Sequence, residues 1–166
     1  NHLLQNRINS VKISKSKVKN FNPNCPVSCD GNIFGLPFTI NEAELVLIPV
    51  PWDVTVSYRD GTSGSPKAIL DASPQLDLFD EDYGEIWKRG IYMERVSDTI
   101  FNKNTVYRKL AKKHIQNLEK GKNSKGIDKR TRQIDDACEE LKHWVKTTSK
   151  KYIEQGKRVG LIGGDH

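Results

Sequence analysis

The sequence predicts an α/β fold with a mostly parallel sheet. Three short apolar runs, near residues 45–50, 91–96 and 158–163, have the length and composition of buried strands. Segments with helical periodicity lie between and around them. Strands that alternate with helices are typical of a parallel sheet with helices packed on both faces. We therefore expect part of a three-layer α/β/α domain, incomplete in this chain.

The first strand leads into a loop and a short helix. Residues 43–50 are mostly apolar, and two prolines near the end of the run require an extended exit. Residues 58–65 have the composition of a loop. Ser65 and Pro66 are residue types favoured at the N-cap and at the first position of a helix. Pro74 should end that helix just after residue 72.

Two longer helices are predicted between the second and third strands, over residues 104–120 and 131–155. The second carries an apolar stripe at spacings of three and four residues, and Gly156 follows where a helix C-cap belongs. The stripe consists of Ile134, Cys138, Leu141, Val145, Thr148 and Tyr152. Residues 121–126 should form a loop between these helices, and residues 80–84 an acidic turn.

The first 35 residues differ from the rest. Residues 1–35 are polar, basic and rich in Pro and Asn, which predicts an irregular N-terminal arm whose role the sequence does not decide. Residues 36–166 would then hold the N-terminal part of the α/β domain. Cys25, Cys29 and Cys138 make an odd count without a secretion signal, which favours free thiols. A metal or redox pair at the first two is the alternative.

Charge and hydropathy exclude some classes of function. The net charge of +6 is uneven, because residues 103–166 carry 17 Lys and Arg against 8 Asp and Glu. Such a basic half can bind nucleic acid. No pattern of stacking aromatic residues accompanies it, so a solvated surface is the better interpretation. No apolar run is long enough to cross a bilayer and no signal segment is seen, so we expect a cytoplasmic protein without membrane contact.

The last strand ends in a chemically distinctive motif, Gly163-Gly164-Asp165-His166. Glycines at the end of a strand permit a sharp turn and a close approach of other groups. The carboxyl ends of parallel strands are where open α/β sheets place their chemistry. His is the commonest metal ligand, and a neighbouring carboxylate can set its tautomer. A plain strand-to-loop turn is the alternative.

A second segment makes the functional interpretation stronger. Residues 47–53 form a strand that ends in Pro-Trp-Asp, and residues 57–69 follow as an Arg-x-Gly loop that leads into a helix. The two segments, in this order, resemble the ureohydrolase (arginase/agmatinase) family, and most closely its agmatinase-like branch. Positions that match the family are Arg59, Gly61, Pro66, Ala68 and Ile69. Positions that depart from it are Ser65, where Gly is usual, and Leu70, where Arg is usual.

The resemblance implies an arginase-like fold in which the first and third strands are neighbours. It also implies a site for two manganese ions, held by His and Asp side chains at strand ends, where activated water attacks a guanidinium carbon and releases urea and an amine. His166 would be a manganese ligand, and Asp165 would act on His166 without itself binding the metal. Arg59, Gly61 and Thr62 would lie in a loop at the active site. Family resemblance further implies a homo-oligomer, a trimer or hexamer.

The catalytic residues are not identified in this chain. The family's other metal ligands lie in Asp-x-His-x-Asp and Asp-x-Asp motifs beyond the position of His166. Asp80 and Asp82 have the second spacing, but they sit in an acidic turn that we expect to be exposed. His2, His114 and His143 are weaker candidates, on a flexible arm or on helix surfaces. We therefore expect residues 1–166 alone to bind manganese weakly and to be inactive.

Two other classes of function stay open. One is a catalytically silent relative of the ureohydrolases that serves as a structural or regulatory subunit. The other is a basic α/β binding module in which Gly163-Gly164-Asp165-His166 is coincidental. If the protein is an active ureohydrolase, its guanidino substrate is undecided among agmatine, guanidinobutyrate, arginine and free guanidine. Trp52 could line a pocket there, although core packing is at least as consistent with its surroundings in the sequence.

Overall fold

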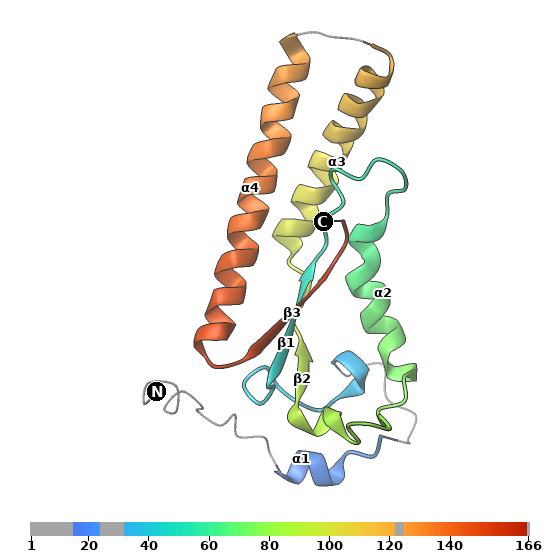
Figure 1. Cartoon of the computed structure of the whole chain (residues 1–166), viewed down its shortest axis with the longest axis vertical. Coiled ribbons are helices and arrows are strands. Elements are labelled where there is room, and N and C mark those ends of the chain that lie inside the picture. Colours follow the sequence, from blue (N-terminus) through green and yellow to red (C-terminus); the bar gives the residue numbers. More distant parts are fainter. Residues whose placement is uncertain (1–14, 24–31, 122–124, 166) are drawn as a thin grey trace. The chain divides into compact units, whose positions relative to one another are not determined.

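The computed structural model describes residues 15–23, 32–121 and 125–165. Its helices and strands, in chain order, are α1 Lys15–Asn20, β1 Leu45–Val50, α2 Ser65–Ala72, β2 Ile91–Met93, α3 Asp98–Glu119, α4 Lys125–Glu154 and β3 Arg158–Gly163 (Figure 1). The chain forms two compact units. The sheet unit combines the described residues up to 48 with residues 67–95 and 149–161. The hairpin unit combines residues 49–66, 96–148 and 162–165.

A three-stranded parallel sheet in the order β2-β1-β3 confirms the predicted fold class. β1 lies in the middle and pairs with β2 in the register Leu45 to Ile91 and Leu47 to Met93. The first and third strands are neighbours, as the family resemblance implied. β1 and β3 also have the predicted bounds. The sheet is small, in keeping with an incomplete domain.

β2 is shorter than predicted, because it ends at Met93 instead of residue 96. The amide of Glu94 still donates to the carbonyl of Leu47, at 2.9 Å. The next ladder bond would need an amide hydrogen from residue 49 of β1, and that residue is Pro49. The ladder between β1 and β2 therefore ends at Pro49, which has no amide hydrogen to donate.

The sheet unit has two apolar centres. Val46, Ile48 and Met93 are fully buried along the strands. A separate cluster of Leu36, Phe38 and Trp87 collects partly buried side chains from the N-terminal region, among them Val18 and Phe21. The Phe21 ring lies 5.0 Å from the Trp87 ring between centroids. The short helix α1 therefore lies within the stretch that we expected to be irregular, and the residues around it pack against this cluster.

Both long helices begin earlier than predicted. α3 begins at Asp98 instead of residue 104, because the Ser97 hydroxyl caps it by accepting from the Ile100 amide. Asp98 in the first turn also suits the positive end of the helix dipole. α4 begins at Lys125 instead of residue 131. The local signal at residues 97 and 98 was present in the sequence and was missed.

The helix α2 ends at the predicted residue, Ala72, but begins differently from the prediction. Ser65 was expected to be its N-cap. Instead a single 3-10 turn, Thr62–Gly64, runs directly into the helix, and Ser65 already has helical backbone angles. Gly61 precedes this turn with a φ of 111°, a left-handed conformation that favours glycine. The turn therefore begins at Gly61, and the loop is more ordered than its composition suggested.

The hairpin unit is built around the antiparallel pair α3 and α4 (Figure 1). Its core consists of Trp52, Val54, Ile100, Ala111, Ile134 and Ala137. Trp52 is 4% exposed, so its indole packs in this core. In the described part of the chain, no helix is both long enough and apolar enough to cross a membrane.

Candidate functional site at the ends of β1 and β3

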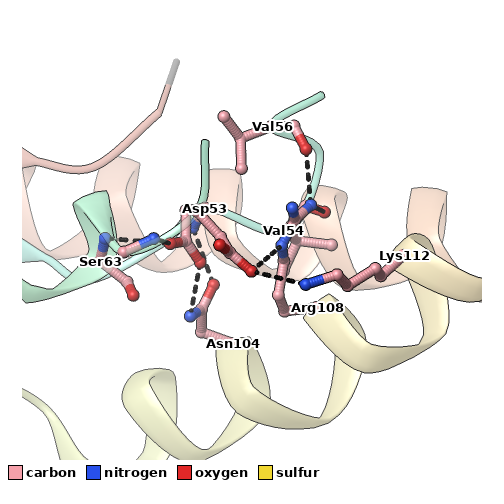
Figure 2. A network of polar contacts seen from close by, with 9 residues as sticks. Asp53, Val54, Val56, Ser63, Asn104, Arg108 and Lys112 are labelled. Carbon is pink, nitrogen blue, oxygen red and sulfur yellow. Dashed lines mark hydrogen bonds and ion pairs between the residues drawn. The ribbon is translucent and has the colours of Figure 1, made fainter. Parts of the chain in front are cut away.

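A buried carboxylate organises the chain where it leaves β1. Asp53 follows the core residue Trp52 and is only 2% exposed. Its carboxylate accepts hydrogen bonds from the backbone amides of Gly61, at 2.8 Å, and Ser63, at 3.3 Å. It also accepts from the side-chain amide of Asn104 on α3, at 2.9 Å, and the Asn104 oxygen accepts from the Asp53 amide, at 2.8 Å (Figure 2). Asp53 thus links residues 61–63, later in the same loop, to the helix α3.

The hydrogen bonds keep Asp53 ionised despite its burial. Burial raises the pKa of the carboxyl, because it disfavours the charged form. The bonds from Asn104, Gly61 and Ser63 stabilise that form and outweigh the effect of burial. The pKa of Asp53 therefore lies below its ordinary value. A buried charge is tolerated here because each oxygen has a donor.

Two cations on α3 hold the middle of the same loop. The guanidinium of Arg108 donates to the carbonyls of Val54, at 3.0 Å, and Val56, at 2.6 Å (Figure 2). The carboxylate of Asp60 pairs with the ammonium of Lys112 at 3.1 Å and lies 3.8 Å from the Arg108 Nε. Arg108 is half-buried, so its two carbonyl bonds are partly shielded from water.

These side chains form one row on α3. Asn104, Arg108 and Lys112 are spaced four residues apart, so they lie on one face of the helix. Each of them holds a different part of the loop that follows β1 (Figure 2). We call this row the polar ridge of α3. It bonds directly to the backbone of Asp53, Val54 and Val56 and reaches the rest of the loop through the side chains of Asp53 and Asp60.

The turn after β3 packs directly on this loop. The amide of Gly164 donates to the Val50 carbonyl at 3.2 Å, and the amide of Asp165 donates to the Trp52 carbonyl at 2.8 Å. A Cβ atom on Gly164 would lie 2.1 Å from the Trp52 oxygen and 3.2 Å from the Ser63 nitrogen. Only glycine fits at that distance. The close approach that the glycines permit is therefore one of backbone to backbone.

The predicted site residues are found in different settings. Arg59, Gly61 and Thr62 are exposed in the loop after β1, and the Arg59 guanidinium lies 5.4 Å from the centre of the Tyr58 ring. Asp165 is exposed and follows the turn after β3. His166 lies outside the described residues. The two segments that resemble the family thus meet through Gly164 and Asp165, while the roles of the individual side chains stay predictions.

The weaker candidates are distributed over the molecule. Asp80 and Asp82 are exposed in their turn, as expected. His143 is exposed on α4, and His114 is half-buried with its Nε2 3.4 Å from the Thr131 hydroxyl oxygen. Cys138 is a free thiol, and burial raises its pKa. The N-terminal candidates His2, Cys25 and Cys29 lie outside the described residues.

The described residues do not by themselves form a complete metal centre. Within residues 15–23, 32–121 and 125–165, no group of three or more His, Cys, Asp and Glu side chains is close enough together to hold an ion. Asp165 supplies one carboxylate next to the position of His166. These two donor types suit manganese, but they are only part of a ligand set.

Sequence reasoning missed the role of Asp53 and its partner Asn104. One signal was available. Asn104 interrupts an apolar face of α3 that includes Ile100, Tyr107 and Ala111, and it is only 4% exposed. A polar residue at a core position needs a hydrogen-bond partner. The sequence did not identify which residue provides it.

Comparison with known families identifies the family of the chain. Residues 43–166 match the model of the Arginase family. The chain belongs to the arginase family. Members of this family are hydrolases of amidino groups. The match covers both segments that meet at Gly164, so the family assignment and the geometry refer to the same part of the chain.

One curated relative is similar over a short stretch. The N(1)-aminopropylagmatine ureohydrolase of Synechocystis sp. is 44% identical over 43 residues. That alignment covers 26% of this chain and 14% of the relative. No solved structure matches the chain.

Proposed function

We propose that the protein is a manganese-dependent amidinohydrolase of the agmatinase-like type, which releases urea and an amine from a linear guanidino compound. The observation that carries the proposal is the meeting of the turn Gly163–Asp165 with the loop after β1, through Gly164 and the backbone of Trp52 and Ser63. In an arginase-family chain, this brings the segment that ends in His166 against the segment that contains Arg59. Parallel sheets gather functional loops at such strand ends.

His166 would be a manganese ligand, and the family resemblance implies that the other ligands come from Asp-x-His-x-Asp and Asp-x-Asp motifs beyond the position of His166. Bound manganese would lower the pKa of water and so supply a nucleophile at neutral pH. The chain's own residues would prepare the site. Asp165 would orient the imidazole ring of His166, as a carboxylate next to a ligating His commonly does. The polar ridge of α3 would keep the loop around Gly61 in one conformation.

Two arguments bear on the substrate. The curated relative is named for an agmatine derivative, which favours a linear guanidino compound of that kind. The Arg59 and Thr62 side chains are exposed on the loop that would border the site. A cytoplasmic location and a homo-oligomeric state belong to the same proposal. They rest on the family resemblance and on the composition of the chain.

Because residues 1–166 alone are expected to be inactive, the test is His166→Ala in a protein that carries the complete set of metal ligands, with His143→Ala as the matched control. His143 is exposed on α4, so its loss should change nothing. Loss of a metal ligand should lower both manganese occupancy and the rate of urea release by roughly 100-fold or more. Urea release from agmatine and metal content by atomic absorption are the measurements. Full occupancy and turnover in His166→Ala would overturn the proposal. If the protein with the complete ligand set and no substitution folds but releases no urea, that result would favour the silent-subunit alternative.

A further inference from the structure

We propose that Asn104 on α3 is a positioning residue for the divalent-cation site at the end of β3. It would act through Asp53 and the loop backbone, and it would itself touch neither cation nor substrate. The inference rests on the proposed function, because that function makes His166 a metal ligand. The contacts that carry it all lie within the hairpin unit.

The first step is the pairing of Asn104 with Asp53. The side-chain amide has an NH2 group that donates and an oxygen that accepts, and both bond to Asp53. The NH2 group donates to the carboxylate at 2.9 Å, and the oxygen accepts from the backbone amide at 2.8 Å. Both residues are almost fully buried. A paired contact fixes the orientation of Asp53 as well as its position. Among neutral side chains of this length, only an amide supplies both functions from one group.

The second step runs from Asp53 to the loop. The carboxylate oxygen that does not face Asn104 receives the amides of Gly61 and Ser63. Water competes poorly for these bonds, because the carboxylate is shielded from solvent. Their loss would leave the amides of Gly61 and Ser63 without the acceptor that fixes them. The conformation of residues 61–63 therefore depends on how Asp53 is held.

The third step runs from the loop to the turn after β3. Gly164 packs against the Trp52 carbonyl and the Ser63 nitrogen with no room for a side chain. The neighbouring Asp165 amide bonds to the same Trp52 carbonyl. A shift in Trp52 or Ser63 is therefore passed directly to the backbone that leads into His166. The helix α3 is a suitable base, since Ile100 and Ala111 anchor it in the core.

The experiment compares Asn104→Ala with Asn102→Ala, which lies on the same helix and is exposed. Both measurements use the protein that carries the complete set of metal ligands, as in the test of the proposed function. Hydrogen exchange of its metal-free form reports the amides of Gly61, Ser63 and Asp165. Calorimetric titration with manganese chloride reports affinity. In Asn104→Ala these amides should exchange roughly 5- to 30-fold faster, the change expected for the loss of a buried hydrogen bond. The manganese Kd should rise about as much, and Asn102→Ala should match wild type in both.

The outcomes separate this proposal from the proposed function. A merely structural role would lower the melting temperature and leave the Kd of the folded protein unchanged, and that result would overturn the inference. Unchanged exchange at Gly61, Ser63 and Asp165 would overturn it as well. If wild type binds no manganese, the proposed function fails, and the exchange data alone decide whether Asn104 holds the turn. If Asn104→Ala does not fold, Asn104→Ser, which keeps one short polar group, serves in the same comparison.

Discussion

Two turns in this molecule are each organised by an aspartate, and they are held in opposite ways. In the hairpin unit, the buried Asp53 accepts from amides eight and ten residues further along the chain and from a helix. In the sheet unit, the exposed Asp80 accepts from the amides of Asp82 and Tyr83, both at 2.9 Å. The backbone of the second turn closes on itself between Asp80 and Gly84. The chemistry is alike, but only Asp53 depends on a distant partner.

The difference shows where precision is needed. A local turn of the second kind can form in an isolated peptide, and water can replace its bonds. The Asp53 turn requires α3 to be in place, and the carboxylate that accepts its bonds is buried together with Asn104. A loop held in this way keeps one conformation as long as the unit is folded. Such a fixed backbone is useful next to a reaction site and has little value on an open surface.

The largest effect is expected for Asp53→Ala. This change leaves the amides of Gly61 and Ser63 and the buried side chain of Asn104 without their acceptor. We expect a loss of about 3 kcal/mol in the free energy of unfolding. Urea denaturation followed by circular dichroism measures it. A loss below about 1 kcal/mol would mean that water reaches these groups and that the contrast with Asp80 is false.

Gly164→Ala tests how rigid the loop is. The added Cβ would lie 2.1 Å from the Trp52 oxygen, so either the turn after β3 or the loop must move. We expect a loss of about 1–3 kcal/mol, the usual cost of forcing a backbone shift. Gly163→Ala is the matched control, because its Cβ would meet Val50 at an ordinary 3.4 Å. Equal melting temperatures for the two variants would show that the loop gives way easily.

Local features explain which parts of the fold were predictable. β1 and β3 have the predicted bounds because an apolar run and the Pro or Gly residues that end it are contiguous in the sequence. The acidic turn at Asp80 was also evident from neighbouring residues. The early start of α3 was predictable in principle, since Ser97 is a local cap. The end of β2 was not, because it depends on Pro49 in another strand.

The site divides in the same way. The family-like segments were recognised from their own residues, and the contact between them at Gly164 agrees with the expected arrangement of strand ends. The pairing of Asp53 with Asn104 joins residues 51 positions apart. Nothing near either residue indicates the other, and only the packing of α3 brings them together. The residues that hold the loop therefore had to be identified from the fold, whereas the family-like segments could be identified from the sequence.

Acid should weaken the Asp53 turn selectively. The pKa of Asp53 is lowered in the folded protein, so its charged form adds stability above the unfolded value of about 3.9. That contribution is lost as pH falls through the lower folded pKa. We expect wild type to be more stable than Asp53→Asn at pH 6, with a gap that narrows steadily below about pH 4. Denaturation at several pH values measures it. If the difference in stability widens in acid, the pKa of Asp53 is raised in the folded protein and not lowered.

The smallest effect is expected for Asp80→Ala. The carboxylate is exposed, so water can satisfy the amides of Asp82 and Tyr83 once it is gone. The backbone bonds between Asp80 and Gly84 survive the substitution, because they do not use the side chain. We expect a loss of about 0.5 kcal/mol or less, as for most surface substitutions. Denaturation in parallel with Asp53→Ala makes the comparison direct. A loss as large as that of Asp53→Ala would mean that the turn supports distant structure, and that burial does not separate the two aspartates.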